Sequence, residues 1–122
     1  MRLEMSHNFK HGEIWTANLD LRFGTEPGKT RPVLIIQNQI LLDAKHPSTL
    51  IIPLTTKLAE DTAPLRLRIK SKNKLFKDSD LLIDQLCALD NSRLQTGPLL
   101  ICNKNFMQRV YQAVLEVLGV IL

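Results

Sequence analysis

Three short groups of residues in this 122-residue chain carry side chains that can act on a phosphodiester. The first is Arg31, because a guanidinium stays protonated and presents a fork of donors that matches two phosphate oxygens. The second is the pair Thr55 and Thr56, whose hydroxyls can donate a hydrogen bond to a nonbridging oxygen. The third is Asp84 with Gln85, where the carboxylate can take a proton from a ribose 2′-hydroxyl. Together these groups indicate phosphate chemistry on RNA.

Each group taken alone has an ordinary explanation that is more common than catalysis. A single arginine is usually a surface cation, threonines often end strands, and an aspartate often makes a structural hydrogen bond. Other chemistries have less support, because the chain has no phosphate-binding Gly-x-x-x-x-Gly-Lys loop, no dinucleotide fingerprint, no nucleophile elbow and no paired zinc motif. The three histidines lack metal-ligand spacing, and Asp78-Ser79-Asp80 is typical of a solvated turn, so no metal or cofactor is predicted.

Short strands are expected to position these groups. Arg31 precedes the predicted strand 32–37, and Pro32 favours an extended conformation of Arg31. Thr55 directly follows a second apolar stretch, so both side chains are predicted to emerge at strand ends. Asp84 and Gln85 interrupt a third apolar run, which predicts a break or bulge there. The predicted strands are 13–19, 32–37, 49–54, 65–70 and 80–89.

Two helices complete the predicted fold. Apolar residues recur every three or four positions from Asn103 to Leu118, with Asn103 as the cap and Gly119 as the stop. A short helical turn is expected at 40–44. Mostly short strands with one terminal helix predict a mainly β fold with some α, namely a small barrel or curled antiparallel sheet closed by the C-terminal helix.

Composition indicates one folded domain with an uneven positive charge. Apolar residues make up 44% of the chain, and we expect a single domain over 12–122 after a flexible arm over 1–11. The net charge is +4, and six cations and no acid fall within 66–77. This segment could bind a polyanion, or it could equally be a solvated basic strand and loop. Two unpaired cysteines, no export signal and no membrane-length apolar stretch predict a cytoplasmic protein.

The same residues resemble the MazF/PemK family of toxin endoribonucleases. Any one of the matching patterns is weak, but five in order with matching gaps are specific. The resemblance runs from about Gly12 to Leu122. The patterns are Gly12-Glu13-Ile14-Trp15, Gly24-x-Glu26-x-Gly28-x-x-Arg31-Pro32-Val33, Gln37-Asn38, Leu54-Thr55-Thr56 and Asp84-Gln85-Leu86.

This resemblance implies an SH3-like barrel, a homodimer, and metal-independent cleavage of single-stranded RNA by 2′-hydroxyl attack that leaves a cyclic phosphate and a 5′-hydroxyl. It also implies an acidic antitoxin in the same groove, with DNA contacted only through that antitoxin. By position, Arg31 and Thr55 become the catalytic pair and Asp84 the candidate base. The expected RNA-binding residues are Glu26, Lys29, Thr56, Lys57, Arg66, Arg68, Lys70 and Gln85.

One departure and two rival functions stay open at this point. Many family members carry a cation two residues after the conserved glutamine, and this chain has Cys87 there. A toxin of the same fold that inhibits a topoisomerase by protein contact would not need Arg31 and Thr55. A non-catalytic module that binds RNA or peptide through its basic strand is the other alternative.

Overall fold

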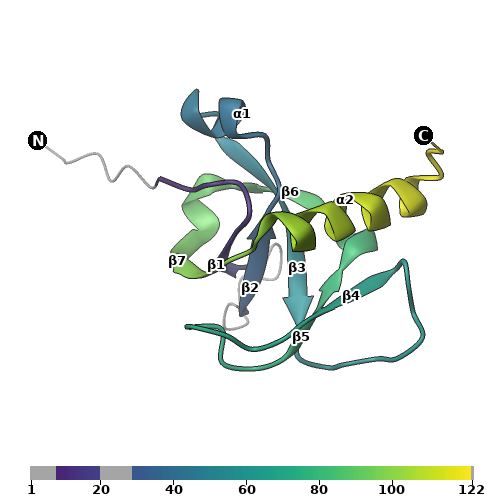
Figure 1. Ribbon diagram of the computed structural model, residues 1–122. Coiled ribbons are helices and arrows are strands. Elements are labelled where there is room, and N and C mark those ends of the chain that lie inside the picture. Colours follow the sequence, from purple (N-terminus) through teal and green to yellow (C-terminus); the bar gives the residue numbers. More distant parts are fainter. Residues whose placement is uncertain (1–7, 20–28, 122) are drawn as a thin grey trace, which may run out of the picture.

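A computed structural model describes residues 8–19 and 29–121 of the chain. Most of these residues form antiparallel strands, and one long helix follows them (Figure 1). The strands are β1 (Glu13–Asn18), β2 (Thr30–Ile35), β3 (Ser48–Thr55), β4 (Arg66–Ile69), β5 (Ser79–Leu82), β6 (Cys87–Asp90) and β7 (Leu94–Ile101). The helices are α1 (Gln39–Asp43) and α2 (Lys104–Leu118), with the 3-10 turns η1 (Ile83–Gln85) and η2 (Asn91–Arg93).

The strands form a curled sheet in the order β4-β5-β3-β2-β1-β7, with β6 paired to the other half of β3. Neighbouring strands are antiparallel throughout. Among the described strands no ladder joins β4 to β7, so closure into a full barrel is not detected. A single backbone hydrogen bond, from Lys74 N to Leu99 O at 3.0 Å, connects the β4–β5 hairpin to β7.

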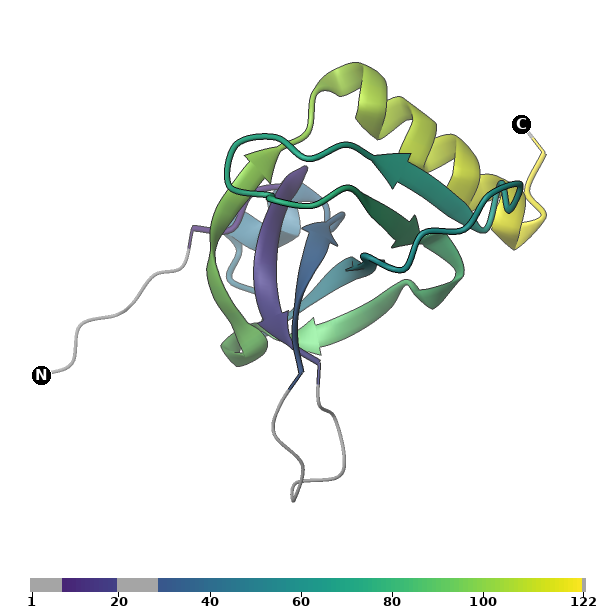
Figure 2. The same ribbon diagram turned by 90° about the horizontal axis from the view of Figure 1, so that it is seen from below.

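Side chains of the three central strands alternate between two hydrophobic clusters, as expected for strands covered on both faces. Ile14, Leu34 and Ile52 point toward α2, where they meet Met107 and Val110. The opposite face carries the second cluster, which is formed by Phe9, Trp15, Ala17, Val33, Ile35, Ile51, Leu89 and Leu94. Figures 1 and 2 show α2 lying along one side of the sheet.

Helix α2 begins and ends at the two predicted residues. The side chain of Asn103 accepts a hydrogen bond from Phe106 N at 2.8 Å, and Gly119 adopts a left-handed conformation with φ of 77°. Its inner face buries Met107, Val110 and Ala113. No helix within the described segments has the length and apolar character needed to cross a membrane.

The predicted strand 80–89 is two strands separated by the turn η1. Ile83 of that turn is 2% exposed in the cluster under α2, whereas Asp84 and Gln85 are exposed. The predicted interruption is therefore confirmed, and its cause is that the chain leaves the sheet between the two segments that pair with β3.

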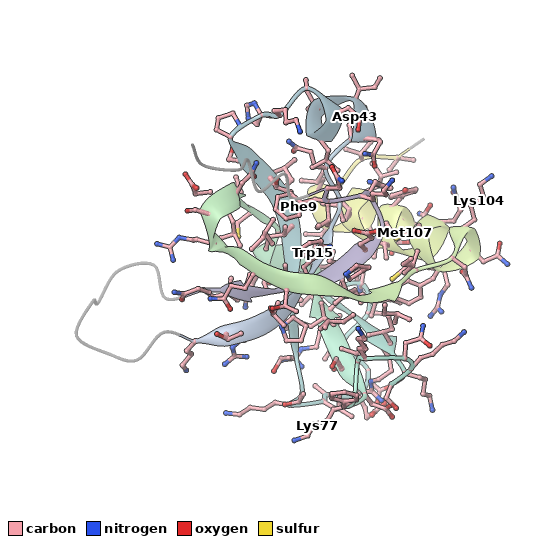
Figure 3. All side chains as sticks on the ribbon, turned by 90° about the vertical axis from the view of Figure 1, so that its left-hand side faces the viewer. Phe9, Trp15, Asp43, Lys77, Lys104 and Met107 are labelled. Atoms are coloured by element: carbon pink, nitrogen blue, oxygen red, sulfur yellow. The ribbon has the colours of Figure 1, made fainter. Side chains whose placement is uncertain are left out.

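Residues that pack against the sheet begin before Gly12, within the predicted flexible arm 1–11. Phe9 is 6% exposed and packs edge-on against Trp15, with ring centroids 4.8 Å apart (Figure 3). Lys10 N donates to Glu13 Oε1 at 3.0 Å, and that same oxygen accepts from Trp15 Nε1 at 2.9 Å. Placing residues 8–11 in the arm was therefore wrong, because Phe9, an apolar residue in a polar segment, packs against buried Trp15. The rest of the arm, residues 1–7, lies outside the described residues.

Candidate functional site

Arg31 and Thr55 face each other across two neighbouring strands. In the β2–β3 ladder Val33 lies opposite Pro53, and two positions further along each strand come Arg31 and Thr55. Residues two apart on a strand share a face, so both side chains lie on the same side of the sheet. Directly opposite residues have Cβ atoms about 5 Å apart, which is close enough for two side chains to bind one phosphate.

Both residues line one open pocket of about 310 Å³ at this end of the sheet. Its described lining includes three cations, Lys29, Arg31 and Lys57, and no acid. None of these three cations is in an ion pair with another described residue. The pocket is therefore cationic, and the remaining lining residues are Thr30, Pro32, Leu54, Thr55 and Thr56.

The Thr55 hydroxyl has a defined orientation within this pocket. Thr55 is 8% exposed, and its Oγ1 accepts a hydrogen bond from Lys57 N at 3.1 Å. Because the backbone N–H occupies one acceptor position of the oxygen, the single hydroxyl hydrogen is free to point elsewhere. The hydroxyl can therefore donate to an anion bound beside Arg31.

The next strand, β5, places the buried carboxylate of Asp80 beside Thr55. Thr55 pairs with Asp80 in the β3–β5 ladder, and Asp80 pairs with Arg68 in the β4–β5 ladder. Asp80 is 1% exposed and accepts from Arg68 Nε at 2.5 Å and Arg66 Nη1 at 3.3 Å. Burial alone raises the pKa of Asp80, but hydrogen bonds from Arg68, Ala59 N and Arg66 outweigh it and lower that pKa below its ordinary value.

The alternation of 65–70 predicts a strand with apolar Leu65, Leu67 and Ile69 on one face and only cations on the other, and these ion pairs correct that prediction. Arg66 and Arg68 do lie on one face, as the alternation predicts, but Asp80 pairs with both guanidiniums and Glu60 with the second. Hydrogen bonds to Asp80 and Glu60 raise the pKa of Arg68. The local sequence predicts a solvated turn at Asp80, which is instead buried, because the register that places it beside two arginines cannot be inferred from local sequence.

Asp84 and Gln85 lie away from the pocket. They sit on η1, which contacts α2, and neither is among the residues that line the pocket of Arg31 and Thr55. β5 runs away from Thr55 after Asp80, so η1 is displaced along the sheet. The described lining of the pocket thus combines Arg31 with Thr55 and Thr56 but includes neither Asp84 nor Gln85, whose roles stay predictions.

The other predicted RNA-binding residues are divided between the pocket and its surroundings. Lys29, Thr56 and Lys57 are exposed pocket residues. Lys70 is exposed just after β4, and Glu26 lies outside the described residues. The RNA-binding roles of all these residues stay predictions.

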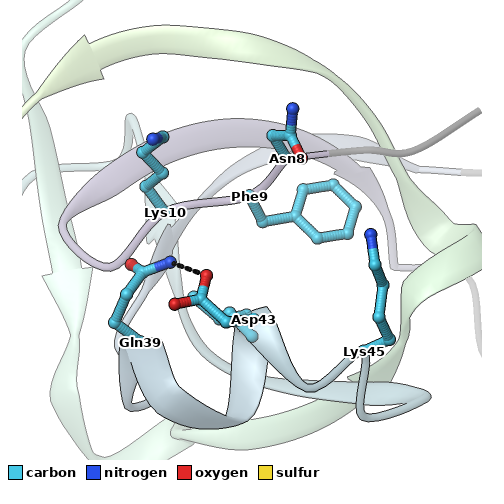
Figure 4. A pocket seen from close by; sticks show the side chains of 7 residues that line it. Asn8, Phe9, Lys10, Gln39, Asp43 and Lys45 are labelled. Atoms are coloured by element: carbon cyan, nitrogen blue, oxygen red, sulfur yellow. Dashed lines mark hydrogen bonds between the residues drawn. The ribbon is translucent and has the colours of Figure 1, made fainter.

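Two further hollows lie elsewhere. A smaller one of about 130 Å³ lies between residues 8–10 and α1, and there Gln39 Nε2 donates to Asp43 at 3.0 Å (Figure 4). The other is an apolar groove on α2 lined by Ile36, Val110, Tyr111, Val114 and Leu115. Neither combines a guanidinium with a hydroxyl, so the pocket of Arg31 and Thr55 is the better candidate for phosphate chemistry.

Comparison with known proteins agrees with the resemblance read from the sequence. Residues 10–118 match the family described as PemK-like, MazF-like toxin of type II toxin-antitoxin system. An endoribonuclease MazF from Staphylococcus saprophyticus is 36% identical over 87 residues, which cover 70% of this chain and 72% of that protein. The chain is thus a homologue of an endoribonuclease.

Solved structures share the fold at low sequence identity. A MazE–MazF crystal structure from Deinococcus radiodurans has a TM-score of 0.75 at 17% identity, covering 93% of this chain and 97% of that one. The Mycobacterium tuberculosis toxin MazF-mt6 has a TM-score of 0.73 at 17% identity, covering 90% and 99%. The predicted mainly antiparallel sheet with a C-terminal helix is therefore confirmed. The chain belongs to the PemK-like, MazF-like toxin family of type II toxin-antitoxin systems.

Proposed function

We propose that this protein is a toxin endoribonuclease that cleaves single-stranded RNA, including mRNA, in the pocket of Arg31 and Thr55. The observation that supports this most directly is that a guanidinium and an oriented hydroxyl line one cationic pocket. Phosphodiester cleavage in RNA needs positioned donors more than an activated side chain, since the substrate carries its own nucleophile.

In the proposed reaction the ribose 2′-oxygen attacks the adjacent phosphorus. The bond from phosphorus to O2′ forms and the bond to O5′ breaks, which leaves a 2′,3′-cyclic phosphate and a 5′-hydroxyl. Arg31 stabilises the charge that develops on the nonbridging oxygens, and Thr55 donates a hydrogen bond to one of them. A guanidinium is a poor proton acceptor, so water or Asp84 takes the 2′-hydroxyl proton, and water protonates O5′. Because Asp84 is not among the described residues that line the pocket, we favour water over Asp84 of the same chain.

The proposed partners follow from the charge of the pocket and from the family. A cationic pocket with no acid among its described lining residues fits an acidic antitoxin that competes with RNA. Proteins of this fold have been solved as a MazE–MazF crystal structure and as an endoribonuclease in complex with its cognate antitoxin. We also propose a homodimer, which is supported by exposed apolar residues on and just after α2, among them Leu118 at 68% and Ile121 at 94% exposure. Light scattering on the purified protein tests the dimer.

An RNA cleavage assay tests the proposed function. The purified protein is incubated with a mixed single-stranded RNA in excess chelator, and we expect fragments with 5′-hydroxyl and cyclic phosphate ends. An Arg31→Ala variant that keeps its fold should lose this cleavage. Intact RNA at high protein concentration would contradict the proposal. Unchanged toxicity of the Arg31→Ala variant in cells would favour topoisomerase inhibition or a non-catalytic binding module instead.

A further inference from the structure

The backbone that follows Thr55 is held by side chains from two other strands. Arg66 Nη1 donates to Lys57 O at 2.8 Å, and Arg68 Nη2 donates to Ala59 O at 3.2 Å. Ala59 N in turn donates to Asp80 Oδ2 at 3.0 Å. Three hydrogen bonds thus fix residues 57–59, which are not part of any helix or strand.

Asp80 is the common centre of these contacts. Asp80 is 1% exposed, and its carboxylate accepts hydrogen bonds from Arg66, Arg68 and Ala59 N. A buried carboxylate between two guanidiniums holds both in one orientation, because charge-assisted hydrogen bonds are the strongest ones available to these groups. Among the described residues Asp80 is the one carboxylate that holds Arg66 toward Lys57 O, whereas Arg68 is held by both Asp80 and Glu60.

The contacts continue from Asp80 to the Thr55 hydroxyl. Arg66 binds the carbonyl of Lys57, and the N–H of Lys57 binds Thr55 Oγ1 at 3.1 Å. A shift of Lys57 would therefore remove or redirect the hydrogen bond that orients the hydroxyl. Asp80 also lies directly opposite Thr55 in the β3–β5 ladder.

We propose that Asp80 is a positioning residue for RNA cleavage, which acts through Arg66 and Lys57 to hold the Thr55 hydroxyl toward the bound phosphate. This inference rests on the proposed ribonuclease function. It gives Arg66 and Arg68 a role in arranging the site in place of the direct RNA contacts that their charge suggested. Asp80, which pairs with both arginines, then contributes to cleavage by positioning Thr55.

The positioning role and an RNA-binding role predict opposite changes. If Arg66 contacts RNA, its loss weakens binding and lowers the salt dependence of binding. If it positions Thr55, its loss lowers kcat and leaves RNA affinity nearly unchanged. A purely stabilising role would lower the midpoint of unfolding and leave kcat per folded molecule unchanged.

The main test compares Asp80→Asn with the matched control Asp78→Asn. Both substitutions remove one negative charge from a carboxylate that accepts a backbone N–H, and Asp78 accepts from Ser71 N at 2.7 Å. In Asp80→Asn one carboxylate oxygen becomes an NH₂ donor, which must face either Arg68 Nε or the pair Arg66 Nη1 and Ala59 N, so at least one of these donors loses its acceptor. We expect kcat to fall about a hundredfold, as for a small displacement of a catalytic group, with KM within about threefold of wild type. Asp78→Asn should keep the wild-type kcat.

Arg66→Met is the second variant, because Arg66 is partly exposed and its loss carries less risk to folding. It keeps the apolar stem and removes the donor to Lys57 O. We expect the same loss of kcat, with retained affinity for an RNA that carries a 2′-deoxyribose at the cleaved position. Weaker binding with unchanged kcat in this variant would overturn the proposal and restore the RNA-contact role.

A measurement without RNA separates this inference from the proposed function. Amide hydrogen exchange at Lys57 should be faster in both Asp80→Asn and Arg66→Met than in wild type or Asp78→Asn. Unchanged exchange at Lys57 would overturn the positioning role whatever the activity shows. Wild-type protein that fails to cleave any RNA would refute the proposed ribonuclease, and the exchange result would still decide whether Asp80 holds this segment. If Asp80→Asn does not fold, a wild-type kcat in Arg66→Met overturns the inference.

Discussion

Arg31 and Thr55 should behave as one unit in a double-mutant cycle. The two variants are Arg31→Ala and Thr55→Val, where valine keeps the shape of threonine and removes the hydroxyl. Removing one donor from a developing oxyanion costs about 10²–10³ in rate, or about 2.7–4 kcal/mol. Each single variant is therefore expected to lose that much in single-turnover cleavage.

The geometry predicts that the two losses do not add. Both residues line one pocket, and the register of β2 and β3 places them opposite each other. Groups within about 7 Å that serve the same phosphate usually show coupling energies of about 0.5–3 kcal/mol. We therefore expect the double variant to lose about 0.5–3 kcal/mol less than the sum of the two single losses.

The assay is single-turnover cleavage of an end-labelled RNA, with circular dichroism to confirm that each variant folds. Thr55→Ser is the control, because serine keeps a hydroxyl that can accept from Lys57 N and donate to the phosphate. It should stay within about tenfold of wild type in rate. Strictly additive losses in the double variant, or a wild-type rate in Thr55→Val, would refute a shared phosphate contact.

Three further predictions concern stability and reactivity. Gly97→Ala should destabilise the fold by about 2–3 kcal/mol in urea unfolding, because the added Cβ would lie 2.4 Å from Trp15 ring atoms that Glu13 holds in place, and an unchanged midpoint would contradict this. Hydrogen bonds keep the pKa of Asp80 in the folded protein below its ordinary value despite burial. The ionised carboxylate therefore stabilises the fold fully above the pKa of Asp in the unfolded chain, about 4, and this contribution is lost as pH falls through the pKa of Asp80 in the folded protein. The loss of stability below about pH 4 should therefore be smaller in Asp80→Asn, and equal acid sensitivity would refute the assignment. Burial raises the pKa of Cys102 to about 11, so at pH 8 the native thiol should be alkylated on the order of a hundredfold more slowly than in the unfolded chain, and equal rates would contradict this.

Local sequence was sufficient for the elements that follow one periodicity. The four strands with clean alternation or apolar runs, and the terminal helix with its cap at Asn103 and stop at Gly119, were predicted close to their observed bounds. The last strand was missed, because Gly97-Pro98 in its middle is typical of a turn. Glycine is required there because the ring of Trp15, far away in the sequence, occupies the space of a Cβ.

Register explains why the site was predicted only in part. Arg31 and Thr55 could be placed at strand ends from local sequence, and the β2–β3 ladder brings them together. Asp80 and Asp84 look alike in sequence, four residues apart in one apolar run. Only the pairing of β5 with β3 and β4 decides that Asp80 lies beside Thr55 and Arg68 while Asp84 turns away with η1.

This arrangement also changes which cations can attract RNA. Because Asp80 and Glu60 together offset the charge of Arg66 and Arg68, the β4 face contributes less to a polyanion site than its sequence suggests. No described carboxylate pairs with the pocket cations Lys29, Arg31 and Lys57. Because these three cations line the same pocket as the oriented hydroxyl, their attraction for RNA would also draw a phosphate toward Arg31 and Thr55.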